Sequence, residues 1–416
     1  MHTMKAYRTD LHSEVLTAYK YRLYPTKAQV VNLELTRVAC QRLYNELLET
    51  SIKSYRENKL TLNWVDLINL IKTSTVPDLH LVHSQVKQDV AIRLYKAMQN
   101  FFRRLKTGGA PGFPRFKAVD RYASFTYPQS GFSLSLLAKS KFCTAKLKLS
   151  KIGTVPVKYH RSIRGLIKTC TIVKDGNGLW YTCFSVRQTK MVVNKILDLD
   201  NHLGIDVGCK HLVNGSDGSA VAAPKFYIKA LDTLALMQAQ LANKRTELQK
   251  ANVPVRADAR YLKLKRRISR KHQQIVHQRD DFLHKLSAET VLNNDVISVE
   301  DLNIKDMTKD NFKTLNRSIL DASWGKFISY LTYKAEKAGK LVVPVDPNYT
   351  SQLCSRCGSI RKLSLSERVY NCESCGLTID RDYNSSINIK KRGIEHINIM
   401  LSKRQLCLIS DTRQCI

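Results

Sequence analysis

Two Cys-x-x-Cys pairs are the residues of this sequence whose spacing is most specific for metal chemistry. The pairs are Cys354 with Cys357, and Cys372 with Cys375. Fourteen residues lie between the pairs, close to the spacing of zinc ribbons. Four thiolates complete a tetrahedral Zn²⁺ site and leave no open coordination position. We therefore predict a structural Zn²⁺ site here, and any catalytic metal ion has to bind elsewhere.

Three carboxylates stand in surroundings where an acidic residue is unusual. Asp206 lies in the apolar run GIDVG, where a buried carboxylate is costly unless it is used. Glu300 ends the apolar, strand-like run VISVE, which places it at the rim of a sheet, where ligands commonly bind. Asp382 opens a helical stretch in DRDYNSSINI, where helix capping is the simplest alternative role.

Taken together, the three carboxylates indicate phosphodiester hydrolysis with two metal ions. That reaction needs hard oxygen ligands from separate elements, with the two ions roughly 3.5 to 4 Å apart. Mg²⁺ or Mn²⁺ suits such ligands. We predict that Asp206, Glu300 and Asp382 are catalytic and hold both ions. Their spacing along the chain does not show that they converge.

The net charge indicates a polyanionic partner. Lys and Arg number 68 against 35 Asp and Glu, a formal charge of +33, while the apolar content of 43% is that of a globular protein. Such an excess favours nucleic acid. It is dense in a predicted helical hairpin at 227–290, broken near Pro254, which is either a solvated face or a phosphate-contacting surface. The candidate contacts on it are Lys263, Lys265, Arg266, Arg267, Arg270 and Lys271.

The elements that must position these residues fall into several segments. YKYRLY at 19–24 predicts a strand, and Thr26 is a plausible N-cap of a helical segment that extends to 106. Residues 121–190 alternate like short strands, and from 199 onward strands and helices alternate. A chain of 416 residues is expected to form several domains. No apolar run is long enough for a membrane span, so we expect no membrane partner and a cytoplasmic location.

Motifs along nearly the whole chain resemble the TnpB family of transposon-encoded, RNA-guided DNA nucleases, which is similar to the type V CRISPR effectors. The motifs are YKYRLYPTKAQ, the FF and GFPRFK block at 101–117, GIDVG, RDDFLHKLS, VISVEDLNI, DASWGKF, SQLCSRCG, YNCESCG and DRDYNSSINI. Carried over residue by residue, the family's catalytic trio falls on Asp206, Glu300 and Asp382. The sequence departs from the pattern at Ser385 and Ser386, where small apolar residues are usual.

The resemblance implies a mixed α/β and β multidomain fold, with a RuvC (RNase H-like) nuclease domain that carries a zinc-ribbon insertion. The implied segments are a first part of a wedge barrel at 1–25, a helical recognition domain at 26–110, the rest of the wedge β-barrel at 111–195, the RuvC domain at 196–350, the nucleic-acid-binding ribbon at 351–378, a final RuvC segment at 379–394 and a C-terminal tail at 395–416.

The resemblance also implies partners. A guide RNA derived from the transposon end would pair with one strand of double-stranded target DNA, in a ribonucleoprotein with one protein chain. The protein would read a short motif beside the target, and Lys and Arg would hold the heteroduplex by its backbone. Gln88, just ahead of an apolar helix at 91–105, matches a family position near that motif. A solvated glutamine at a helix start is an equally good interpretation.

Three other classes of protein share some of these features. A guided DNA-binding regulator without cleavage would keep the basic surface and the ribbon, but the intact carboxylate trio argues against it. A transposase with a histidine pair and a tyrosine nucleophile needs a different spacing from that of His80 and His83. A plain zinc-ribbon binder leaves Asp206 and Glu300 unexplained.

Overall fold

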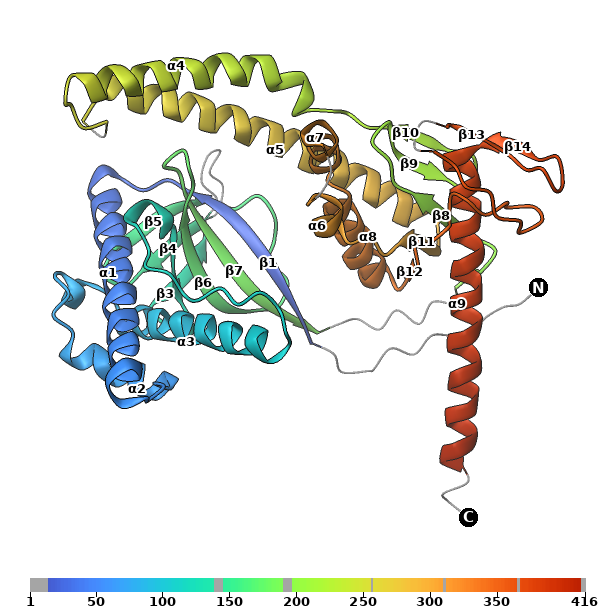
Figure 1. Ribbon diagram of the computed structural model, residues 1–416. Coiled ribbons are helices and arrows are strands. Elements are labelled where there is room, and N and C mark those ends of the chain that lie inside the picture. The colour runs from blue at the N-terminus through green and yellow to red at the C-terminus, as the bar shows by residue number, and fades with distance from the viewer. Residues whose placement is uncertain are drawn as a thin grey trace. The chain divides into compact units, whose positions relative to one another are not determined.

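The structure, a computed structural model, describes residues 14–137, 145–189, 197–255, 257–309, 312–364 and 367–412 (Figure 1). The chain divides into two compact units, and the boundary between them lies at residue 190. We call them the N-terminal unit, His12–Lys190, and the C-terminal unit, whose described residues begin at 197.

The N-terminal unit begins with a strand and a helical segment. Strand β1 (Glu14–Leu23) starts five residues before the predicted strand. Thr26 caps helix α1 in a reciprocal capping box with Gln29, which confirms the predicted N-cap. The helices of the segment are α1 (Lys27–Asn58), α2 (Trp64–Leu70) and α3 (Ser84–Lys106), with 3₁₀ turns at Ile71–Thr73 and Leu79–Leu81.

Antiparallel strands complete this unit. After a 3₁₀ turn at Val119–Arg121, the strands are β2 (Ser124–Tyr127), β3 (Phe132–Leu136), β4 (Ala145–Leu149), β5 (Gly153–Lys158), β6 (Leu166–Lys174) and β7 (Trp180–Thr189). The sheet order is β2-β6-β7-β1-β5-β4-β3. Because β1 pairs with β5 and β7, the helical segment is an insertion into one sheet. The described pairings leave β2 and β3 at opposite ends, so closure into a barrel stays a prediction.

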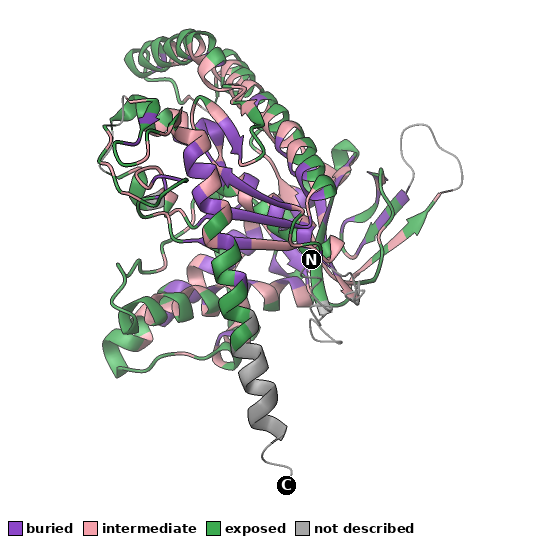
Figure 2. Cartoon of the chain, turned by 90° about the vertical axis from the view of Figure 1, so that its right-hand side faces the viewer, coloured by how far each residue is buried: buried purple, intermediate pink, exposed green. Residues whose placement is uncertain are grey.

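The C-terminal unit is built on a five-stranded sheet of order β10-β9-β8-β11-β12. Its strands are β8 (His202–Asp206), β9 (His211–Gly215), β10 (Ala220–Ala222), β11 (Val296–Glu300) and β12 (Leu341–Val345). Strands β8, β11 and β12 are parallel, and β9 and β10 are antiparallel to their neighbours. Every residue of β11 is buried, as expected for a parallel strand covered on both faces (Figure 2).

Helices cover both faces of this sheet. Leu203, Ile205 and Val299 belong to a core shared with α5, α7 and α8, whereas Val296 and Val343 belong to a core shared with α9. The helices are α4 (Leu231–Lys250) after a 3₁₀ turn at Ile228–Ala230, α5 (Ala259–Asn293), α6 (Ile304–Met307), α7 (Lys313–Ala322), α8 (Trp324–Ala338) and α9 (Arg381–Thr412). Helices α4 and α5 form the predicted hairpin, and α9 continues unbroken across the expected boundary at 394–395.

Helix α9 approaches the sheet closely because small residues line the contact. A methyl group on Gly204 of β8 would lie 2.2 Å from the carbonyl oxygen of Ser386 and 2.6 Å from the backbone nitrogen of Lys390. A methyl group on Gly393 would lie 1.8 Å from Oγ of Ser298 in β11. Ser386 is fully buried, and its hydroxyl donates a 2.7 Å hydrogen bond to the carbonyl of Tyr383. Serine therefore fits where the family pattern has small apolar residues.

The cysteine pairs lie in a small two-stranded element between β12 and α9. Its strands are β13 (Val369–Asn371) and β14 (Thr378–Asp380). Tyr370 is fully buried among the cysteines and forms the centre of this element. Among the described residues, no helix has the length and apolar content needed to cross a membrane.

The contact at Gly204 yields a prediction. Gly204→Ala should destabilise the C-terminal unit by about 3 kcal/mol, because the added methyl group meets helix backbone that cannot rotate away. At this size of unit, the loss lowers the Tm by roughly 6 to 12 °C in calorimetry. The control is Gly112→Ala in the N-terminal unit, where the nearest contact of the new methyl group is the Arg104 guanidinium at 3.5 Å. Equal Tm values for the two variants would contradict the tight packing of α9.

Candidate functional site

Asp206 and Glu300 end two neighbouring parallel strands. Ile205 of β8 is in register with Val299 of β11, so the next residue of each strand is Asp206 and Glu300. Side chains two apart on a strand share a face. Asp206 therefore shares the face of Gly204, which α9 covers, and Glu300 shares the face of Ser298. The two carboxylates lie at the carboxyl edge of the sheet, on its α9 side.

Asp382 reaches the same edge from α9. It lies one helical turn before Ser386, the residue that packs on Gly204, and positions four apart lie on one face of a helix. The helix cap is supplied by its neighbour: Asp380 Oδ1 accepts hydrogen bonds from the backbone N–H groups of Asp382, at 2.9 Å, and Tyr383, at 3.0 Å. The capping role that the sequence left open for Asp382 thus belongs to Asp380, and the side chain of Asp382 faces other partners.

The three carboxylates share one electrostatic environment. Burial raises the pKa of Asp206 well above its usual value, and the charges of Glu300 and Asp382 raise it further. Burial also raises the pKa of Glu300, against the opposing effect of a hydrogen bond from Thr350. Together with the strand register and the contact of α9 on Gly204, the effect of Glu300 and Asp382 on Asp206 indicates that residues far apart in the sequence, at 206, 300 and 382, lie near one another in space. This convergence was not visible from their spacing.

Basic side chains partly neutralise this cluster. Arg381 contacts Asp382 through Nη2 at 3.1 Å, and Arg368 Nη1 lies 3.7 Å from the other oxygen of Asp382. Within the described residues, the four cysteine sulfurs all lie within 4.8 Å of one another, but the carboxylate oxygens of Asp206, Glu300 and Asp382 do not. Like charges repel and the arginines attract Asp382, so both forces oppose close approach of the carboxylates.

A buried polar network holds Glu300 and the start of the cysteine element. The hydroxyl of Thr350 donates a 2.6 Å hydrogen bond to Glu300 Oε1, and both residues are buried. The Nδ2 group of Asn388 donates to the carbonyl oxygens of Thr350, at 2.9 Å, and Leu353, at 2.7 Å. Asn384 donates to the carbonyl of Leu353, at 2.8 Å. Sequence analysis did not identify Thr350 or Asn388; the four-residue spacing of the two asparagines was the available signal.

The four cysteines form a site with the geometry of a zinc centre. All four sulfur atoms lie within 4.8 Å of one another, with 3.7 Å between Cys354 and Cys375 and 3.5 Å between Cys357 and Cys372. Tetrahedral Zn–S bonds of about 2.3 Å place the sulfurs roughly 3.8 Å apart. The two knuckles are built alike, because Gly358 and Gly376, both at positive φ, donate to the carbonyls of Cys354 and Cys372. The donor set fits Zn²⁺.

The predicted nucleic-acid contacts lie on helices. On α5, Lys263, Lys265, Arg266, Arg267 and Arg270 are exposed and Lys271 is half-buried. No acidic residue occurs from 259 to 279, so this length of helix presents positive charge without intrahelical acidic partners. Gln88 is exposed, but α3 begins at Ser84. The prediction that Gln88 precedes its helix was wrong, since the polar start SQVKQD already forms the first helical turns.

Three family models match this chain in order. A model described as a helix-turn-helix domain matches residues 13–59, one described as a probable transposase matches 190–311, and one described as a Cas12f1-like TNB domain matches 324–389. The last range contains the four cysteines of the two Cys-x-x-Cys pairs. The first range forms β1 followed by the single helix α1, so its structure here is a strand and a helix.

Known proteins match the chain along its length. It is 30% identical over 399 residues to the putative RNA-guided DNA endonuclease InsQ of Escherichia coli K12, which covers 91% of this chain and 92% of that one. It is 29% identical over 238 residues to the TnpB-like protein L79 of Acanthamoeba polyphaga mimivirus, 55% of this chain and 44% of that one. Its fold resembles a Cas12f1–sgRNA–target DNA complex with a TM-score of 0.52 at 14% identity, covering 87% and 82% of the chains. These matches show that the chain belongs to the TnpB family.

Proposed function

We propose that this protein is an RNA-guided DNA endonuclease that hydrolyses phosphodiester bonds at Asp206, Glu300 and Asp382. The observation that supports this proposal most is that the three carboxylates lie at one edge of the sheet. Two of them come from adjacent parallel strands and one comes from α9. The match to a putative RNA-guided DNA endonuclease over 91% of the chain supports the same activity. Guide RNA and double-stranded target DNA are the proposed partners of a ribonucleoprotein with one protein chain.

The strand order of the C-terminal unit supports a RuvC-type, RNase H-like domain. Its first three strands, β8, β9 and β10, form an antiparallel meander, and β11 and β12 continue the sheet parallel to β8. We propose that this sheet with α9 is the nuclease domain. In the N-terminal unit, we propose that the sheet is the wedge domain and that the helices inserted after β1 are the recognition domain.

Each site residue has a proposed task. Asp206, Glu300 and Asp382 hold divalent metal ions, and their oxygen donors and mutual repulsion suit Mg²⁺ or Mn²⁺. Bound ions supply Lewis acidity toward the scissile phosphate and activate water. Thr350 fixes the side chain of Glu300 through its 2.6 Å hydrogen bond. Arg381 and Arg368, beside Asp382, hold positive charge near the position of a phosphate.

The cysteine element is proposed to be a structural zinc ribbon that binds nucleic acid. It is connected to the carboxylate site at both ends: Thr350 and Asn388 connect its start to Glu300, and β14 ends at Asp380, two residues before Asp382. Loss of Zn²⁺ is therefore expected to disturb the position of Asp382 as well as the ribbon.

The first prediction concerns catalysis. Asp206→Asn should abolish cleavage of a guide-matched DNA duplex in Mg²⁺ while RNA binding stays unchanged, because the carboxylate serves as a metal ligand and not as an RNA contact. Gel-based cleavage and binding assays measure both. The control is Asp301→Asn, which alters an exposed carboxylate next to Glu300. Cleavage by Asp206→Asn at the native rate would disprove the proposed site, and absence of cleavage by the native chain would favour a guided DNA-binding regulator.

The second prediction concerns pH. The pKa of Asp206 is raised in the folded chain, so the native state holds its proton more tightly than the unfolded state. Without metal, this contribution to stability is lost as pH rises from the ordinary aspartate pKa of about 4 through the raised value. In buffer without added Mg²⁺ or Mn²⁺ and without a chelator, so that the four-cysteine site keeps its zinc, the Tm advantage of Asp206→Asn over the native chain should therefore grow from pH 5 to pH 8. Mg²⁺ should raise the Tm of the native chain but not that of Asp206→Asn. A Tm difference that stays constant from pH 5 to pH 8 would contradict the raised pKa of Asp206.

The third prediction concerns zinc. Cys354→Ser should reduce bound zinc from one ion per chain to nearly none and lower the Tm of the C-terminal unit, because metal binding contributes directly to folding of such sites. Elemental analysis and calorimetry measure the two effects. Cys209→Ser, at a half-buried cysteine of the same unit outside the cluster, is the matched control and should retain zinc. Unchanged zinc content in Cys354→Ser would refute the four-cysteine site.

A further inference from the structure

Aromatic side chains lie at the end of α3 and in the segment that follows it, beyond the core of the N-terminal unit. We call them the aromatic platform: Phe101 and Phe102 are half-buried, Phe113 contacts Phe101, and Phe116 follows three residues later in the sequence. Phe113 is 43% exposed and Phe116 is 56% exposed. On α3 the buried core ends at Leu94, about two turns before Phe101. A group of exposed aromatic rings is a feature of binding surfaces.

The platform is ordered by contacts of its own. After α3, Gly108 takes positive φ and the N–H of Gly109 donates to the carbonyl of Arg104 at 3.0 Å, so the chain reverses direction. The reversal brings the ring of Phe113 to 5.2 Å from that of Phe101, edge to face. Because both rings are held by the fold, little ordering entropy remains to be lost when a ligand binds.

The other end of the platform is anchored to α1. The backbone N–H of Lys117 donates to Oδ1 of Asn45 at 2.8 Å, and its carbonyl accepts from Nδ2 of the same asparagine at 3.0 Å. This two-way bond fixes the backbone one residue after Phe116. The hydrogen bonds at Lys117 therefore hold the neighbouring backbone in place, and the ring of Phe116 remains exposed to solvent.

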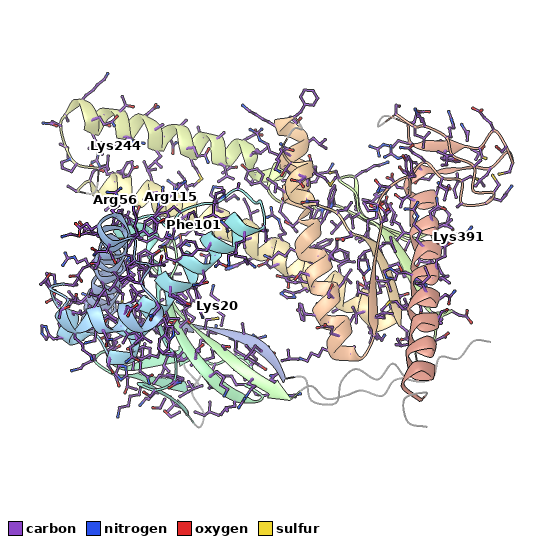
Figure 3. All side chains as sticks on the ribbon, turned by 60° about the horizontal axis from the view of Figure 1, so that its bottom comes forward. Lys20, Arg56, Phe101, Arg115, Lys244 and Lys391 are labelled. Atoms are coloured by element: carbon purple, nitrogen blue, oxygen red, sulfur yellow. The ribbon has the colours of Figure 1, made fainter. Side chains whose placement is uncertain are left out.

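Positively charged residues flank the phenylalanines in the sequence. No Asp or Glu occurs from residue 90 to residue 119. Four exposed cations lie beside the phenylalanines in sequence: Arg103, Arg104, Lys106 and Arg115. Figure 3 labels Phe101 and Arg115 in this region of the N-terminal unit. Cations complement phosphates and aromatic faces complement bases, so the combination fits nucleic acid with accessible bases and does not fit an apolar protein partner.

We propose that the aromatic platform binds unpaired bases of the guide RNA by stacking, while the flanking arginines contact its phosphates. A DNA duplex keeps its bases stacked inside the helix, whereas an RNA scaffold presents bases in loops and at ends, where aromatic side chains can reach them. This proposal rests on the proposed function for the identity of the RNA. It adds a base-contacting site that is separate from the carboxylates.

The experiment measures binding of a fluorescein-labelled single-stranded RNA of about 12 nucleotides, within the usual range of such sites, to the full chain by anisotropy at several salt concentrations. The double variant Phe113→Leu/Phe116→Leu should bind roughly tenfold more weakly, the usual effect of losing a stacked base. The slope of log Kd against log salt should stay unchanged, because phosphate contacts remain. Arg115→Gln should instead reduce the magnitude of that slope by about 0.7.

Two controls make the result specific. Tyr55→Leu removes a ring of similar exposure, 55%, from α1 of the same unit, and should leave the RNA affinity unchanged. A DNA duplex of the same sequence should bind the double variant and the native chain alike. All proteins carry Asp206→Asn, so binding is measured without cleavage, and failure of the proposed nuclease activity cannot imitate failure of the platform.

Three results would overturn the proposal. One is native RNA affinity in the double variant; another is an equal loss of affinity for the DNA duplex. A third is a larger loss for single-stranded DNA than for RNA, which would assign the platform to a target strand. If the double variant has a lowered Tm, the single variant Phe116→Leu decides, because within the described residues the ring of Phe116 packs against no other aromatic ring. Native affinity in that single variant would then also overturn the proposal.

Discussion

The close contact between α9 and the central strands is the constraint on which the C-terminal unit depends. Gly204 on β8 and Gly393 on α9 leave no room for a methyl group, so helix backbone and sheet meet at one fixed distance. Because Asp382 lies one turn from Ser386, this distance also sets the separation of Asp382 from Asp206. A packing requirement made of small residues thus fixes the geometry of the carboxylate site, although no glycine takes part in its chemistry.

The site itself is held in an electrostatically unfavourable state by that packing. Burial and neighbouring carboxylates raise the pKa of Asp206, and the fold does not relieve the repulsion by separating the strands, because β8 and β11 are locked in register. Such repulsion is what a divalent cation removes. The stabilising contacts around the site are short and directional: Thr350 on Glu300, Arg381 on Asp382 and Asp380 on the first turn of α9. They hold Glu300 and Asp382 in place, and the arginines offset charge at Asp382.

Two of the asparagines on α9 connect this site to the cysteine element. Asn384 and Asn388, one turn apart and fully buried, both donate to the carbonyl of Leu353, immediately before the first cysteine. One helix therefore carries a candidate metal ligand, the packing surface for the sheet and the anchor of the cysteine element. The aromatic platform of the N-terminal unit follows a similar rule, because Asn45 fixes the backbone from which an exposed ring projects. In both units, hydrogen bonds between asparagine side chains and the backbone hold the segments that carry the proposed binding groups.

The sequence by itself determined the features that depend on local spacing: the four-cysteine site, the N-cap at Thr26, the apolar strands that end at Asp206 and Glu300, and the basic hairpin. It also indicated the family through motifs spread along the chain. Only the tertiary structure decided that Asp380 caps α9, that Thr350 supports Glu300, that Gln88 lies inside a helix, and that residues at 206, 300 and 382 share one field. Local spacing in the sequence predicts helix caps and Cys-x-x-Cys knuckles because the residues that form each of them lie within a few positions of one another. Contacts between strands and α9 join residues far apart in the sequence, and only side-chain packing fixes which of them meet.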